Sequence, residues 1–408
     1  MGMPSAKAGI TEISPAGRLL GSLFVPPVAR APYATKPGDS RGRLYRETES
    51  ATRSCYQRDR DRILHSTAFR RLKHKTQVFV ESEGDYYRSR MTHSLEVAQI
   101  ARSMSRVLAL DEDLAEALAH DMGHTPFGHA GEEALAAASA DIGGFDHNAH
   151  ALRLVTKLEH RYADFDGLNL TWETLEGLVK HNGPIKPPVP APISGFDARW
   201  PLELSTWPGL EAQIAALADD IAYLTHDIDD GLRAGLFEIG DLEGAPLAGM
   251  HVISIHKRYG TLELSRFIGE LVRTLIGLLA EDLIAETRRR LAQAGPGSAA
   301  EVRTGQGPTA AFSPAMERDA AALKQFLFAR MYRHKRVMAS MDKAKTVVAE
   351  LFQVLSREPS LLPADWAAAC GGAGDAVTAG IVRDYIAGMT DRFALLEYRR
   401  IFHTEIAL

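Results

Sequence analysis

A long apolar repeat between residues 211 and 237 constrains the fold of this chain more than any other feature. Its apolar residues recur at spacings of three and four: Ile214, Leu217, Ile221, Leu224 and Ile228. This period belongs to one face of an α-helix. The repeat therefore predicts a long amphipathic helix and fixes the face that it buries.

A line of polar residues lies on the side of this helix turned away from the repeat. Asp219, Tyr223 and Asp227 follow one another at intervals of four residues, so their side chains stack along one line. A solvated acidic face and the lining of a cleft both fit this arrangement. The tyrosine in the middle of the line favours the cleft.

Helical patterns recur elsewhere, and extended segments are few. Further helices are expected over residues 59–72, 92–108, 111–121, 171–179, 262–291 and 320–355. Residues 1–45 lack periodicity and are rich in Pro, Gly, Ala and Arg, which predicts a flexible N-terminal arm. The segment 320–355 carries a dense basic cluster, for which a solvated face and an anion-binding surface are alternatives.

Composition narrows the class of protein. Hydrophobic residues make up 45% and charged residues 24% of the chain, which are ordinary globular values. The net charge of -5 gives no overall basic field for nucleic acid. The two cysteines, Cys55 and Cys370, lie far apart without a CxxC spacing. Together with the lack of a signal-peptide pattern, they predict a cytoplasmic protein without a membrane span.

One short stretch, residues 119–132, combines three imidazoles and two carboxylates with glycines and a proline. The residues concerned are His120, Asp121, His124, His129 and Glu132. Histidine-rich tracts of this kind are typical of metal binding. His147 and His150 follow at the start of an expected helix.

A mixed ligand set can be assembled around this stretch. His93, in the first turn of an expected helix, joins His120, Asp121 and one of Asp219 or Asp220. Two imidazoles and two carboxylates favour a divalent ion such as Mn, Fe, Mg, Zn or Ni. The absence of thiol ligands argues against a structural zinc site.

Six segments carry a more specific signal, and together they closely resemble the deoxyguanosine triphosphate triphosphohydrolase (dGTPase-like) family of the HD superfamily. The resemblance covers about residues 45–350. The segments are 59–63 (DRDRI), 69–72 (FRRL), 75–78 (KTQV), 90–94 (RMTHS), 120–129 (HDMGHTPFGH) and 218–223 (ADDIAY).

The resemblance implies an all-α fold, an HD-domain helical bundle with additional helices and few or no strands. It implies an HD core over residues 46–240 and, over residues 241–408, a helical region that completes the nucleotide pocket and makes oligomer contacts. The metal ligands it implies are His93, His120, Asp121 and Asp219. Asp219 is preferred to Asp220 because it precedes Tyr223 by four residues.

The resemblance also implies catalytic roles. His124 contacts the α-phosphate side, His129 and Glu132 form the catalytic pair, and His147 is a second candidate general acid. The substrate-binding residues it implies are Gln77 for the 3′-hydroxyl, Arg90 for the phosphates, Tyr223, Asp227 and Tyr332 for the sugar and base, and Lys335 near the triphosphate.

The expected reaction is hydrolysis of a deoxynucleoside triphosphate, dGTP among the candidates, to a deoxynucleoside and triphosphate. A water activated by a divalent metal, Mg²⁺ or Mn²⁺ first, attacks the α-phosphorus. A homo-oligomer and a dNTP effector are further expectations. The alternatives are an HD phosphohydrolase acting on other nucleotides, and a nucleotide sensor that binds single-stranded nucleic acid.

Overall fold

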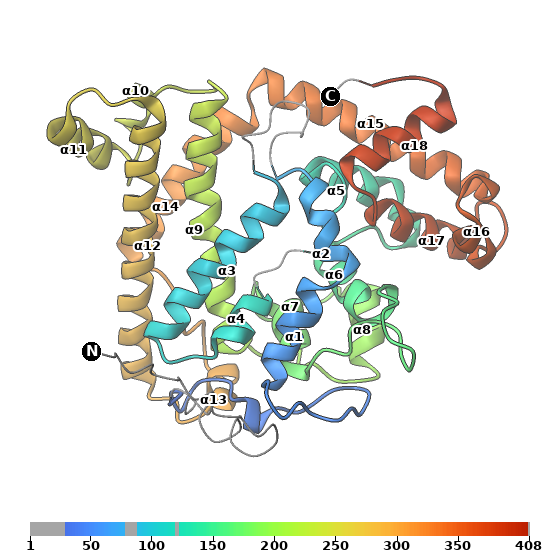
Figure 1. The fold of residues 1–408 in the computed structure, drawn as a ribbon, viewed down its shortest axis with the longest axis horizontal. Coiled ribbons are helices and arrows are strands. Elements are labelled where there is room, and N and C mark those ends of the chain that lie inside the picture. The colour runs from blue at the N-terminus through green and yellow to red at the C-terminus, as the bar shows by residue number, and fades with distance from the viewer. Residues whose placement is uncertain (1–28, 78–87, 119–121, 407–408) are drawn as a thin grey trace, which may run out of the picture.

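The computed structural model describes residues 29–77, 88–118 and 122–406, and these form a helical molecule (Figure 1). Within these ranges, extended backbone pairs only in isolated bridges, such as the one between Thr76 and Ser89. The expected all-α fold is therefore confirmed.

The helices before residue 240 are mostly short, apart from α3 and α9. They are α1 (Cys55–Leu64), α2 (Thr67–Arg71), α3 (Arg90–Val107), α4 (Glu112–Leu118), α5 (Gly128–Ala138), α6 (His147–Arg153), α7 (Trp172–Lys180), α8 (Ala191–Asp197), α9 (Leu210–Arg233) and α10 (Ile239–Leu242).

The helices after residue 240 include the longest one, α12. They are α11 (Gly249–Tyr259), α12 (Leu264–Ala294), α13 (Ala299–Arg303), α14 (Pro314–Leu327), α15 (Lys335–Arg357), α16 (Ala364–Ala369), α17 (Ala376–Ala387) and α18 (Asp391–Phe402).

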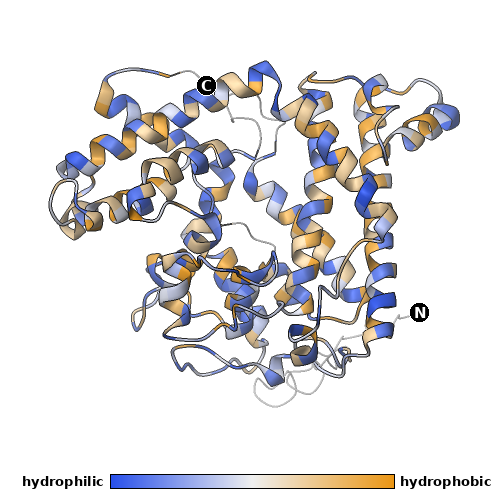
Figure 2. Cartoon of the chain, turned by 180° about the vertical axis from the view of Figure 1, so that it is seen from behind, coloured by the Kyte–Doolittle hydropathy of each residue, from blue (hydrophilic) through white to orange (hydrophobic). Residues whose placement is uncertain are grey.

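Helix α9 is the helix predicted from the apolar repeat, and it lies between α3 and α12 (Figure 1). Ile214, Ile221 and Ile228 are fully buried, whereas Leu217 is half-buried. Burying each such side chain contributes about 1.5–3 kcal/mol. The apolar faces of α9 and its neighbours are turned toward one another (Figure 2).

Side-chain caps set the start of the two helices that lead to the site. Ser89 accepts a hydrogen bond from the backbone N–H of Thr92 at the start of α3. Asp111 Oδ1 accepts one from the N–H of Leu114 at 3.0 Å and caps α4. Such caps satisfy backbone donors that a helix start leaves open.

Three hydrophobic cores hold the helices together. The first joins α3, α4, α9, α11, α12 and α14, the second joins α1, α2, α6, α7 and α8, and the third joins α5 with α15, α17 and α18. The first core spans residue 240, where the sequence predicts a domain boundary. Through the third core, α15, α17 and α18 pack together with α5.

Part of the segment expected as a flexible arm lies against the core. Thr35 donates from its backbone N–H and its hydroxyl to the buried Glu211, at 2.9 and 2.7 Å. Arg43 Nη1 donates to the carbonyl of Asn169 at 2.7 Å. Residues 29–45 are thus held by hydrogen bonds, and residues 1–28 lie outside the described part.

Three details of the helices differ from the prediction. The helix expected over residues 59–72 is divided into α1 and α2, because Ser66 accepts a hydrogen bond from the N–H of Phe69 and starts a new helix. Helix α8, which is not among the expected helices, follows Pro190, because proline is compatible with the first turn of a helix. The helix expected over residues 320–355 is divided: a π-helical turn, Phe328–Tyr332, follows α14, and α15 begins only after His334. This division points Tyr332 at α9.

None of the helices in the described ranges is long and apolar enough to cross a membrane.

Replacing Ile221 by alanine tests the role of α9 as the central helix. The change leaves a cavity in the first core and should lower the free energy of unfolding by about 2–5 kcal/mol. Urea denaturation measures this. The control is Leu217→Ala on the same helix, which should cost clearly less because Leu217 is only half-buried; equal costs would contradict the assigned face.

Candidate active site

A polar cavity of about 360 Å³ opens between α3, α6, α9 and the start of α5. Residues predicted from the sequence line much of it: Gln77, Arg90, His124, His129, His147, Asp219 and Tyr223. They come from segments far apart in the chain, so the fold assembles most of the predicted site in one place.

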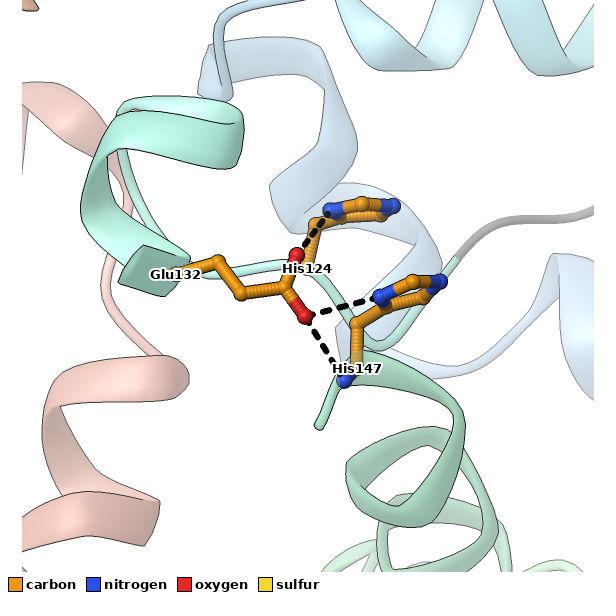
Figure 3. A group of neighbouring side chains, drawn as sticks. All are labelled: His124, Glu132 and His147. Carbon is orange, nitrogen blue, oxygen red and sulfur yellow. Dashed lines mark hydrogen bonds and ion pairs between the residues drawn. The ribbon is translucent and has the colours of Figure 1, made fainter. Parts of the chain in front are cut away.

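Glu132 is the centre of a histidine cluster beside this cavity (Figure 3). Its Oε1 accepts from the backbone N–H of His147 at 3.1 Å and lies 2.8 Å from His147 Nδ1. Its Oε2 lies 3.7 Å from Nδ1 of both His124 and His129. The rings of His124 and His147 stack with centroids 4.3 Å apart.

Glycines allow the loop before α5 to pack this closely. A Cβ on Gly123 would lie 2.0 Å from the carbonyl oxygen of His147, and one on Gly131 would lie 1.9 Å from that of Pro126. Phe127, which precedes α5, takes a left-handed backbone conformation with φ of 60°. This conformation is unfavourable for a bulky side chain, so other contacts must hold the loop.

The histidines keep Glu132 ionised. Burial acts to raise the pKa of the Glu132 carboxyl, but hydrogen bonds from His129 and His147 and the nearby imidazoles outweigh it, so this pKa lies well below its ordinary value. Since the imidazoles turn Nδ1 toward the carboxylate, their Nε2 atoms lie on the opposite side of each ring (Figure 3). The cluster can therefore hold protons on imidazoles beside the cavity.

His93 and Asp219 meet at another edge of the cavity. His93 is buried, and its Nε2 lies 2.8 Å from Oδ1 of Asp219. Asp220, the alternative ligand, turns toward Lys324 at 3.8 Å. The predicted ligands His120 and Asp121 lie outside the described residues; Leu118 and Met122, on either side of them, line the cavity.

The donor sets fit a divalent ion. An imidazole nitrogen and a carboxylate oxygen of the kinds that such ions bind lie side by side at His93 and Asp219. His124, Glu132 and His147 form a further group that could hold an ion, with ligand atoms within 4.8 Å of one another. The family resemblance implies only catalytic roles for the residues of this second group.

Tyr223, Asp227 and Tyr332 form the other end of the site. Tyr332 Oη donates to Asp227 Oδ2 at 2.7 Å, and the rings of Tyr223 and Tyr332 stack 6.0 Å apart. Burial raises the pKa of the Asp227 carboxyl to about 8, although the hydrogen bond from Tyr332 opposes the shift. Asp227 is 2% exposed, so the solvated-face interpretation is wrong at this position.

A second cavity, of about 650 Å³, adjoins this end. It shares His129 and Tyr223 with the first cavity. The rest of its lining combines aromatic, sulfur-containing and small side chains with two cations and two carboxylates: Phe328, Tyr332, Met338, Met341, Ala130, Ala136, Arg333, Lys345, Glu132 and Glu133. The two cavities therefore form one site with a polar end and an aromatic end.

Of the other residues considered for the site, some line a cavity and some do not. Gln77 places a buried Oε1 at the first cavity, with no hydrogen-bond partner within the part of the chain that the structure describes. Lys335 is exposed at the start of α15 and does not belong to the lining described for either cavity. Lys324 does line the first cavity, 5.6 Å above the Tyr223 ring, and was visible in the sequence only as a member of the basic cluster.

The C-terminal helices hold the loop that carries His124. Asp391, at the start of α18, accepts hydrogen bonds from the backbone N–H groups of Thr76 and Phe127, both at 2.8 Å. The buried Lys75 donates from Nζ to the carbonyls of His124 and Ala387, at 2.5 and 2.8 Å. The sequence indicated only packing helices in this region.

An all-α fold with this histidine and aspartate arrangement defines an HD-domain protein. The family model described as "HD domain" matches residues 90–224. A second model, "Phosphohydrolase-associated domain", matches residues 310–400, which include the helices that hold the loop. HD domains bind divalent metal ions, in agreement with the donor sets described above.

Curated relatives carry the name deoxyguanosinetriphosphate triphosphohydrolase-like protein. One from Parvibaculum lavamentivorans is 60% identical over 384 residues, covering 92% of this chain and 97% of its own length. One from a Bradyrhizobium species is 57% identical over 375 residues, covering 91% and 96%. The chain therefore belongs to the deoxyguanosinetriphosphate triphosphohydrolase-like family of HD-domain hydrolases.

Replacing Asp391 by alanine tests whether the C-terminal helices hold the loop. The change leaves the buried N–H groups of Thr76 and Phe127 unpaired, which costs about 1–3 kcal/mol for each such group. Thermal unfolding should show this loss, and amide hydrogen exchange should rise over residues 122–131. The control is Asp365→Ala in the exposed part of α16; the same profile for both variants would contradict the role of Asp391.

Proposed function

We propose that this protein hydrolyses deoxynucleoside triphosphates to a deoxynucleoside and inorganic triphosphate by attack of water at the α-phosphorus. The observation that carries this proposal is the junction of a polar cavity and an aromatic cavity at His129 and Tyr223. A ligand with a polyanionic part and a flat apolar part fits across that junction. Nucleotides have this composition.

The polar cavity supplies donors for the phosphates. A triphosphate carries about four negative charges at neutral pH, so it needs several cationic or imidazole groups to be held and to stabilise the charge that develops at phosphorus. Arg90, His124 and Lys324 line this cavity. They come from α3, the loop before α5 and α14, and so surround the bound phosphates.

His93 and Asp219, with the predicted ligands His120 and Asp121, would hold a divalent ion, Mg²⁺ or Mn²⁺ in our proposal. When bound, the ion supplies Lewis-acid stabilisation and lowers the pKa of water. The half-exposed side chain of Asp219 places a carboxylate at the cavity wall, and the buried His93 contacts it from within the protein.

Glu132 and its histidines move the protons. The ionised carboxylate accepts from His147 and lies near Nδ1 of His129, so it stabilises a protonated imidazole at either position. Such an imidazole can donate through Nε2 to the leaving 5′-oxygen, which is general acid catalysis. The stacked ring of His124 limits the orientation of His147.

The aromatic cavity takes the nucleoside in our proposal. Tyr223 and Tyr332 offer stacked ring faces, and the buried Oε1 of Gln77 is an acceptor suited to a 3′-hydroxyl. A largely uncharged Asp227 carboxyl, with its raised pKa, contacts Tyr332 without adding full charge near the phosphates. The relatives' name makes dGTP the first substrate to test.

We further propose a cytoplasmic homo-oligomer that responds to a dNTP effector, by analogy with the family. A role as a sensor that binds single-stranded nucleic acid is the alternative, and the exposed arginines and lysines of residues 330–336 would be its contact surface.

Product analysis tests the reaction. Purified protein is incubated with each dNTP, singly and mixed, with Mg²⁺ or Mn²⁺, and the products are separated. The expected products are a deoxynucleoside and tripolyphosphate. Release of orthophosphate or pyrophosphate would overturn the proposal in favour of another nucleotide hydrolase, and activity in mixtures alone would support the dNTP effector.

Glu132→Gln tests the proton role of the cluster. The amide keeps the shape of the side chain but loses its charge, so kcat should fall by about 10²–10⁴-fold while the metal content, measured by mass spectrometry, stays that of the wild type. The control is Glu317→Gln, an exposed residue of α14 that lines neither cavity. Loss of metal from Glu132→Gln would instead assign His124, Glu132 and His147 to ion binding.

A further inference from the structure

A chain of polar contacts runs behind the proposed metal site. His93 Nδ1 lies 3.1 Å from His226 Nδ1, and His226 Nε2 lies 3.1 Å from Oε2 of Glu96. His226 is as buried as His93, and the two rings meet edge to face. Neither His226 nor Glu96 lines the cavities described above.

The chain occupies one nitrogen of His93 and leaves the other at the Asp219 side. The two Nδ1 atoms share one hydrogen bond, so His93 Nδ1 is engaged by His226. His93 Nε2 then faces Oδ1 of Asp219 at 2.8 Å. An imidazole nitrogen and a carboxylate oxygen that lie side by side are a pair of the kind that can share a divalent cation.

Arg88 anchors the outer end of the chain. Its Nε donates to Glu96 Oε2 at 2.9 Å, and its terminal nitrogens contact Asp229 and Asp230 of α9 at 2.8 and 3.0 Å. The half-exposed Glu96 is therefore held by a cation that is itself fixed to the helix carrying His226.

We infer that His226 and Glu96 are positioning residues that fix the orientation of His93 for metal binding. Glu96 and His93 lie one turn apart on α3, and His226 on α9 bridges them. These contacts thus join the two helices that carry His93 and Asp219. This inference rests on the proposed metal site.

Metal affinity in three variants tests the inference. His226→Leu removes the hydrogen bond to His93 Nδ1 and should weaken Mn²⁺ binding by about 10–100-fold, measured from the electron paramagnetic resonance of free Mn²⁺. His226→Asn keeps a polar group that can hydrogen-bond to His93 Nδ1 and should restore most of the affinity. The control is Thr225→Val, a buried neighbour whose hydroxyl donates only within α9; its affinity should equal that of the wild type.

The outcomes separate this inference from the proposed function. If the wild type binds no Mn²⁺, the proposed metal site fails. If the wild type binds and His226→Leu, correctly folded, binds equally well, the positioning role is overturned. If His226→Leu does not fold, Glu96→Leu replaces it, because a half-exposed residue can be changed without unfolding the protein. Weaker Mn²⁺ binding by Glu96→Leu supports the positioning role, and unchanged binding contradicts it.

Discussion

The active-site loop depends on one buried carboxylate, that of Asp391. It accepts hydrogen bonds from the backbone N–H groups of Thr76 and Phe127. Phe127 has a left-handed backbone conformation, which is unfavourable for a phenylalanine. From Phe127 the chain enters α5, which carries His129 and Glu132. Helices α17 and α18 therefore support the candidate active site, although none of their residues is in the lining described for either cavity.

Stability and chemistry meet on α9. One face of this helix buries Ile214, Ile221 and Ile228 in the first core, and the other presents Asp219 and Tyr223 to the cavity. Because both faces belong to one rigid helix, a change in core packing moves Asp219 and Tyr223 together. The hydrogen bond between His93 and His226 and the contact between His226 and Glu96 tie the neighbouring α3 into the same unit.

Much of this could be predicted from the sequence, because the period of apolar residues and the caps are local. The span of α9, the cap at Asp111 and the gathering of Arg90, His124, His147 and Asp219 follow from such signals and from the family resemblance. The roles of Asp391 and His226 could not be predicted, since each depends on contacts between segments far apart in the chain. The resemblance implies Lys335 near the triphosphate, whereas Lys324 lines the first cavity; a basic cluster in the sequence does not show which of its members faces a cavity.

Helix α9 also sets a fixed length. Asp219 and Asp227 are eight residues apart on an uninterrupted helix, which at 1.5 Å per residue is about 12 Å along its axis. A continuous helix cannot stretch or shorten between these residues without breaking its hydrogen bonds. The distance between Asp219, at the proposed metal site, and Asp227, beside Tyr332, is therefore fixed. The opposite wall is less regular, because the π-helical turn and the break before α15 interrupt the helix there; in the proposed nucleotide complex, adjustment to a larger or smaller base would fall to that wall.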